Sequence, residues 1–256
     1  MSAQKLSSRI VARSTSTDAA LLVPFALLFF FFIVGPALLS FPFASGPVPD
    51  VGDLVDLATP FVLLPFYYVM LRRSTADGAR FHILPERVLV LVFFLSAILF
   101  TQGQGMHLSA NSIGHFLKED GGTAAEGITY FYDEILSHYF VWAGVLGLAL
   151  VISLAGIRSA AEAGRRGSSL PAVVAALIYG LTFAMAAVEG QTVPMGLPVS
   201  MLLAGILVLC RRRHCAVDTP FATFFGVGHG FAVLLLIGWG LYFRGFPEFS
   251  AVGLLR

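Results

Sequence analysis

Seven long apolar stretches limit what this chain can fold into more than any other feature. They cover residues 20–43, 54–71, 88–113, 128–155, 170–189, 194–209 and 221–243. A helix of about 20 apolar residues pairs its backbone groups internally and matches the thickness of a membrane's hydrocarbon layer. Apolar residues also make up 57% of the chain and charged residues only 12%, unlike the composition of a soluble domain. We therefore predict an all-α fold, a polytopic membrane bundle of seven transmembrane helices.

Basic residues fall in alternate connections between these stretches. Lys5, Arg9 and Arg13 precede the first stretch, and the second, fourth and sixth connections contain further arginines. Lys and Arg collect on the cytoplasmic side of membrane proteins, so we expect the N-terminus inside and the C-terminus outside. The apolar core of the first stretch is longer than that of a typical signal peptide, which favours a retained helix. The predicted parts are a polar cytoplasmic segment (1–19), a transmembrane domain (20–243) and a short outer tail (244–256).

This organisation predicts an integral protein of a bacterial inner (plasma) membrane, whose partner is a membrane lipid or a lipid-soluble substrate. No basic stripe is interleaved with aromatic residues, so we exclude nucleic acid as a partner. Whether another membrane protein is a partner stays an open question. Cys210 and Cys215 flank a basic segment at a predicted cytoplasmic helix end, where a disulfide is not expected. With His214 they offer three metal ligands in one short loop, a weaker candidate site than the one described next.

The third stretch carries a polar stripe. Gln104, His107, Asn111 and His115 are spaced by three, four and four residues, which places them on one face of a helix. His115 lies next to charged residues, so we expect it to be solvated at the membrane surface. Polar groups in hydrocarbon are unfavourable unless they meet partners or a water-filled cavity. The stripe therefore indicates either a functional site or hydrogen bonds that hold the bundle together.

Three other predicted helices carry ionisable side chains. These are Asp133, Glu134 and His138 near the start of the fourth helix, Glu189 at the end of the fifth, and His229 between glycines in the seventh. The dipole of a helix does not stabilise a carboxylate at its C-terminal end, so Glu189 needs another partner. As alternatives, His229 is a satisfied core histidine and Glu134 with His138 only braces one helix. We expect the remaining acids nearby, Asp50, Asp53 and Asp56, to solvate the outer loop and the helix start.

Imidazoles and carboxylates from four helices favour a metal site. We expect His107, His138 and His229 to bind zinc, with iron, copper or haem as alternatives. Glu134, Glu189 and Asp133 are the catalytic candidates: either glutamate is a fourth ligand or general base, while Asp133, Gln104 and Asn111 orient the ligands. The expected depths of the histidines in the membrane differ, so one shared site requires tilted helices. Otherwise there are two layers, an outer one with His107, Glu134 and Glu189 and a deeper one with His138 and His229.

The predicted topology and these residues resemble the CREST superfamily of seven-helix membrane hydrolases, which includes the alkaline ceramidases. The resemblance implies a zinc ion and hydrolysis of a lipid amide or a related bond. It also implies that His107 is the early histidine, Asp133 the aspartate and His229 the last-helix histidine. The family pairs two last-helix histidines four residues apart, whereas Phe225 and Val233 stand at that spacing from His229. Gly103 stands where the family has a serine.

We therefore expect a metal-dependent integral membrane enzyme that hydrolyses a lipid-soluble amide or ester in the outer half of the bundle. Metal-bound hydroxide would attack the carbonyl carbon, and Glu134 or Glu189 would take up the proton. Two alternatives stay open. One is a redox protein that binds haem, iron or copper, with His138 and His229 as a haem pair. The other is a non-enzymatic membrane transporter or accessory subunit.

Overall fold

The computed structural model describes residues 3–39, 41, 50–75, 84–117, 122–158, 170–212, 216–217 and 220–254. The helices are α1 (Ala3–Leu38), α2 (Val51–Thr75), α3 (Glu86–Leu117), α4 (Ala124–Tyr130), the π-helix η2 (Phe131–Ser137), α5 (His138–Ala155), α6 (Leu170–Glu189), α7 (Val193–Arg212) and α8 (Pro220–Phe243). Within these ranges the strands are β1 (Ile157–Arg158) and β2 (Ala216–Val217), one antiparallel pair. Each predicted stretch is helical, although the fourth covers parts of α4, η2 and α5, and the first helix ends at Leu38 rather than at residue 43. The all-α prediction is confirmed.

Length and composition support an integral membrane protein. The helices long and apolar enough to cross a membrane are Ala20–Leu38, Val51–Thr75, Glu86–Leu117, Ala124–Ala155, Leu170–Glu189 and Pro220–Phe243. The apolar part of α7, Val193–Leu209, is shorter. The described chain thus contains six candidate spans and one shorter apolar helix, and the count of seven stays a prediction. Helix α1 begins at Ala3, inside the segment predicted to be a polar N-terminal region.

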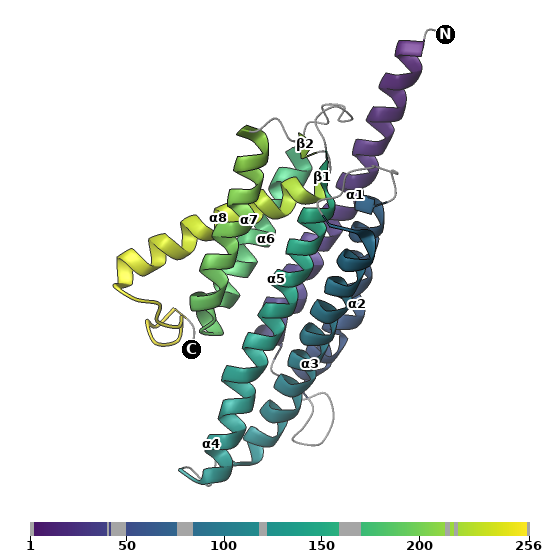
Figure 1. Ribbon diagram of the computed structural model, residues 1–256. Helices are drawn as coiled ribbons and strands as arrows, with labels where there is room; N and C mark the ends of the chain where they lie inside the picture. The colour runs from purple at the N-terminus through teal and green to yellow at the C-terminus, as the bar shows by residue number, and fades with distance from the viewer. Residues whose placement is uncertain are drawn as a thin grey trace.

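Glycines set how closely the helices pack (Figure 1). Helix α3 lies along α5, and α8 packs against both α6 and α7. A Cβ atom on Gly103 of α3 would lie only 2.5 Å from the backbone nitrogen of Val141 on α5. A Cβ on Gly180 of α6 would overlap the carbonyl oxygen of Gly228 on α8. Small residues thus let two pairs of helix backbones touch.

Aromatic side chains fill the space between α1, α2, α6 and α8. Phe25, Tyr67, Tyr179 and Phe225 have no exposed surface. The ring centroids of Phe25 and Tyr67 lie 5.0 Å apart and those of Tyr179 and Phe225 lie 5.4 Å apart, both in edge-to-face contact. Such contacts add to the free energy of burying the rings. This cluster joins helices from both ends of the sequence.

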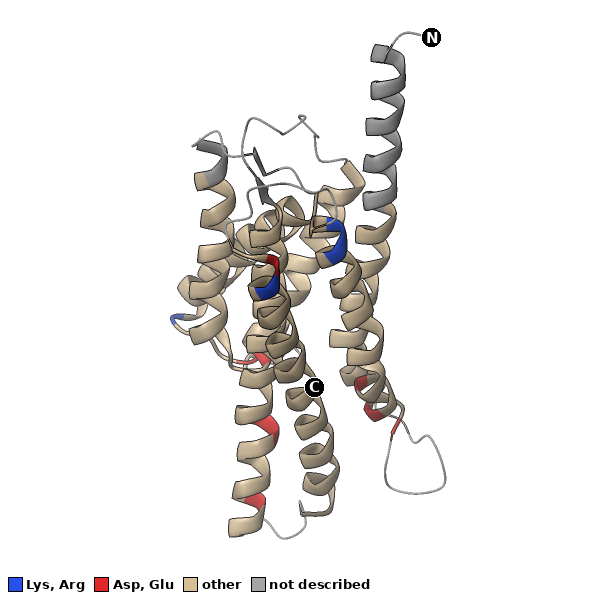
Figure 2. Ribbon diagram, turned by 45° about the vertical axis from the view of Figure 1, so that its right-hand side comes forward, with Lys and Arg blue, Asp and Glu red and all other residues tan. Residues whose placement is uncertain are grey.

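The charged side chains separate toward the two ends of the bundle (Figure 2). Arg72 and Arg73 in the last turn of α2 and Arg87 at the start of α3 lie at one end, where Glu86 lies 3.6 Å from Arg72. We call the other end the acidic end, and define it by Asp50, Asp53, Asp56, Asp133, Glu134, Glu189 and Glu248. Glu86 at the arginine end and the exposed Arg244, directly after α8, are exceptions to this separation. The separation is consistent with the predicted orientation, which stays a prediction.

Candidate functional site

A cavity of about 460 Å³ lies at the acidic end. Its lining comes from α1 to α6 and from the segment that follows α8. Four carboxylates and two imidazoles line it: Asp56, Glu134, Glu189, Glu248, His107 and His138. None of the described lining residues is Lys or Arg. Such a lining favours a positively charged occupant, because carboxylates outnumber imidazoles and no described lining residue carries a permanent positive charge.

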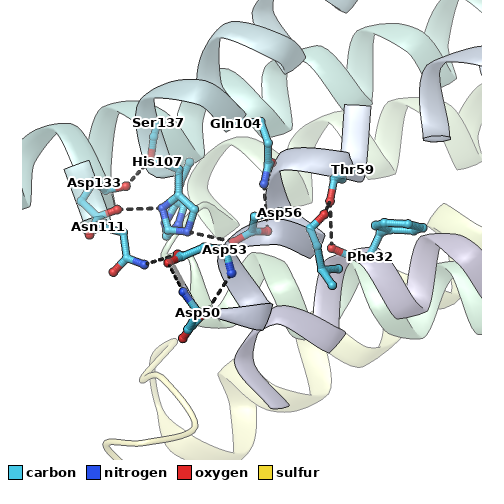
Figure 3. A network of polar contacts seen from close by, with 12 residues as sticks. Phe32, Asp50, Asp53, Asp56, Thr59, Gln104, His107, Asn111, Asp133 and Ser137 are labelled. Carbon is cyan, nitrogen blue, oxygen red and sulfur yellow. Dashed lines mark hydrogen bonds and ion pairs between the residues drawn. The ribbon is translucent and has the colours of Figure 1, made fainter. Parts of the chain in front are cut away.

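His107 is the centre of the polar network (Figure 3). Its Nδ1 lies 2.8 Å from Oδ1 of Asp133, and its Nε2 lies 4.0 Å from Oδ2 of Asp56. The imidazole on α3 is therefore placed between carboxylates from η2 and α2. One nitrogen makes a close contact, whereas the other faces its carboxylate across a gap.

Helix α2 supplies the hydrogen-bond partners of the polar stripe. These partners were not predicted from the sequence. Gln104 donates to Asp56 Oδ1 over 2.9 Å, and Asn111 donates to Asp53 Oδ1 over 3.3 Å. Asp53 is only 4% exposed, so the expectation that these acids merely solvate the loop and helix start is wrong for it. Asp50 and Asp53 also accept each other's backbone N–H at the start of α2. In the sequence, Asp53 and Asp56 are three residues apart and so lie on one helix face, and this spacing could have indicated their pairing with the stripe.

The π-helix η2 places two neighbouring acids at the site. Asp133 is buried against His107, while Glu134 is half exposed and lines the cavity. The Ser137 hydroxyl donates to the carbonyl oxygen of Asp133 within this segment. Short π-helical segments inside α-helices occur frequently at functional sites. Helices α4, η2 and α5 follow one another without a break, and the π-helical turn contains Asp133 and Glu134.

His138 follows η2 directly and lies beside His107. The two ring centroids are 5.0 Å apart, and Nδ1 of His138 lies 3.9 Å from Oε2 of Glu134. Glu134 and His138 are four residues apart, so the sequence predicted this pairing. The helices α3 and α5 thus bring two of the predicted metal ligands together.

The segment after α8 folds back over the end of α6. Glu189 accepts the backbone N–H of Phe249 over 3.0 Å, and the side-chain amide of Gln191 donates to Glu248. Gln191 has a φ of 50°, in the left-handed region, where the chain turns from α6 to α7. The partner that Glu189 needed is therefore a backbone group of the predicted outer tail. Glu248 joins the site only through this tertiary contact, so no local pattern revealed it.

His229 lies in a different environment. It has no exposed surface and does not line the cavity. The Tyr179 hydroxyl lies 3.2 Å from its Nε2 and the Ser200 hydroxyl 2.9 Å from its Nδ1. Both ring nitrogens are thus paired, as in a satisfied core histidine. The structure therefore divides the predicted three-histidine set, and it places His138 with His107 rather than in a layer with His229.

The described residues do not form a complete metal site as they stand. No three His, Cys, Asp or Glu side chains among them are grouped closely enough to hold one ion. His107 Nε2 and Asp56 Oδ2 lie 4.0 Å apart, wider than the roughly 3.3–3.6 Å between two ligands of a tetrahedral zinc ion with bonds of about 2.0–2.2 Å. Of the alternative set, His214, Cys215 and the side chain of Cys210 lie outside the described part of the chain.

No protein-family model, curated protein or solved structure matches this chain. The resemblance to the CREST superfamily therefore stays a prediction. The case for a function depends on the cavity and the residues around His107.

Proposed function

We propose that the protein is a metal-dependent membrane enzyme whose cavity hydrolyses a lipid-soluble amide or ester. The observation that carries the proposal is the placement of His107 between two carboxylates. A metal-binding histidine usually gives its other ring N–H to a carboxylate, which fixes the tautomer and the direction of the ring. The 2.8 Å distance from Nδ1 to Asp133 Oδ1 places a carboxylate beside one ring nitrogen of His107 and leaves Nε2 facing Asp56, which supports the same pairing here.

His107 Nε2 and Asp56 are the first two ligands in this proposal. His138, whose ring lies beside that of His107, is the third after a change of its rotamer. A bound metal ion of this type makes its water more acidic and polarises a carbonyl oxygen. Zinc suits these ligands, and iron or copper suits them as well.

The chain's own residues have separate roles. Asp133 holds the His107 ring, while Gln104 holds Asp56 through a 2.9 Å hydrogen bond. Glu134 lines the cavity with its side chain 44% exposed, so it can accept a proton from an attacking water molecule and exchange it with solvent. Phe32 and Trp142 line the same cavity and would contact the hydrocarbon part of the substrate. We assign no catalytic role to His229.

We also propose that α7 crosses the membrane, which gives seven spans with the N-terminus inside. Helix α6 ends at Glu189, and Glu189 contacts Phe249, which follows the end of α8. Both helices therefore end on the same side, so α7 must return the chain between them. The arginines at the opposite end support a cytoplasmic location for that end and an outer location for the cavity. A bacterial inner membrane is part of this proposal.

Hydrolysis assays on the purified protein test the activity. The substrates are a panel of long-chain amides and esters presented in mixed micelles, with and without a metal chelator. The expected result is release of fatty acid that stops with chelator and in His107→Ala, but continues in His115→Ala on the exposed end of α3. Activity that survives both chelator and His107→Ala would contradict the proposal.

Since both nitrogens of His229 are already paired, the haem pair of His138 and His229 gains no support from this arrangement.

A further inference from the structure

The cavity has two chemically different sides. Phe32, Ile33 and Ala37 of α1 and Val141 and Trp142 of α5 form an apolar wall. Glu189 and Glu248 line the cavity from the end of α6 and from the segment after α8. At about 460 Å³, the space is far larger than a metal ion and a few water molecules of about 30 Å³ each would need. The shape and the wall fit a molecule with a hydrocarbon part.

Among the described residues, the hydrogen-bond donors to the two glutamates are neutral groups. Glu189 accepts a backbone N–H, and Glu248 accepts from the amide of Gln191. Both lie close enough to Glu134 for the charges to interact. Among the described residues that line the cavity, only the imidazoles of His107 and His138 can carry positive charge, and their ion pairs are with carboxylates other than Glu189 and Glu248. A cation bound between them would relieve the repulsion.

We propose that Glu189 and Glu248 bind the ammonium group of an amphiphilic substrate whose hydrocarbon chain lies against the apolar wall. This inference rests on the proposed function and names the class of substrate: a lipid-soluble amide or ester that also carries a positively charged amine. An organic cation uses both sides of the cavity, whereas an inorganic ion would use only the carboxylates. The subsite is separate from His107 and Asp56, so it can be tested without the metal.

Thermal unfolding of the full chain in a neutral detergent tests the subsite, because a ligand that binds the folded protein raises its melting temperature. The probes are octylamine, which is protonated at pH 7, and 1-octanol, which has the same chain without the charge. Octylamine is expected to raise the melting temperature of the wild type and 1-octanol is not. The apparent affinity for octylamine should fall about tenfold in Glu189→Gln and in Glu248→Gln, as for the loss of one charge-assisted contact.

Glu86→Gln is the matched control, since it makes the same change at the opposite end of the bundle. Equal shifts with octylamine and 1-octanol, or an octylamine shift that neither cavity variant reduces, would overturn the proposal. A shift with Ca²⁺ or Mg²⁺ that depends on these glutamates, with none from octylamine, would also overturn it and assign an inorganic ion. The two variants should keep the metal content of the wild type. A wild type without metal that still shows the octylamine pattern would refute the proposed enzyme and leave the ammonium subsite standing.

Discussion

Nδ1 of His107 lies 2.8 Å from Oδ1 of Asp133, so one imidazole–carboxylate contact connects α3 to the π-helical start of the long α4–η2–α5 helix. Asp133 is only 9% exposed, so water does not replace it easily. With Nδ1 beside Asp133, Nε2 of His107 faces Asp56.

Replacing Asp133 with Asn tests that role. The variant keeps the size of the side chain but removes the charge that orients His107, so we expect metal affinity to fall roughly 10- to 100-fold. Calorimetric titration of the metal-free protein with zinc measures the change in affinity. Asn111→Ala removes a neighbouring side chain that donates to Asp53 rather than to His107, so it should have a smaller effect. An unchanged affinity in Asp133→Asn would show that the contact only braces the helices.

Gly103 should be intolerant of any side chain. Its Cβ would lie 2.5 Å from the backbone nitrogen of Val141, so Gly103→Ala must push α3 and α5 apart. We expect it to lower the free energy of unfolding by about 1–3 kcal/mol. Unfolding in mixed micelles with increasing sodium dodecyl sulfate measures this loss.

Gly105→Ala is the control for that experiment, two residues further along α3. A Cβ there meets no atom within 4 Å, so the change should be neutral or stabilise the helix by up to about 1 kcal/mol. Equal stability of the two variants would mean that α3 and α5 are not packed as closely as described.

His229→Ala should lower the stability of the protein without changing its metal binding. The change leaves the hydroxyls of Tyr179 and Ser200 without their buried partner, so we expect a loss of about 1–3 kcal/mol in stability, increased by the cavity that remains. Metal content and metal affinity should stay those of the wild type. If His229→Ala instead removed the metal, the predicted three-histidine site would be restored and the separation described above would be wrong.

The topology can be tested by cysteine labelling after Cys210 and Cys215 are replaced with serine. Ser250, exposed in the segment after α8, lies on the side of the cavity, whereas Thr75 ends α2 beside the arginines. We expect a membrane-impermeant maleimide to label Ser250→Cys in intact cells and Thr75→Cys only after the membrane is opened. The reverse pattern would invert the orientation, and labelling of both in intact cells would contradict the proposed span arrangement.

Much of the fold could be predicted because a membrane's hydrocarbon layer requires long apolar stretches that form helices. The apolar stretches predicted the helices, and the spacing of Gln104, His107 and Asn111 predicted a polar face that indeed contacts acids. The pairing of Glu134 with His138 also followed from helical spacing.

The rest depended on contacts between distant parts of the chain. Asp53 and Asp56 looked like solvated residues because they lie near a loop, and only the packing of α2 on α3 shows that they pair with the stripe. Glu248 reaches the cavity because the chain folds back after α8. His229 carried the same chemical signal as His107, but buried hydroxyls on α6 and α7 satisfy it.

Elemental analysis, with a visible spectrum, tests the central claim most directly. The protein would be purified in mild detergent without chelator, as wild type and as His107→Ala. We expect about one zinc, iron or copper ion per wild-type chain, no Soret band, and a large loss of metal in the variant. Absence of metal from the wild type, or equal metal content in both proteins, would contradict the account and leave a bundle braced by polar contacts.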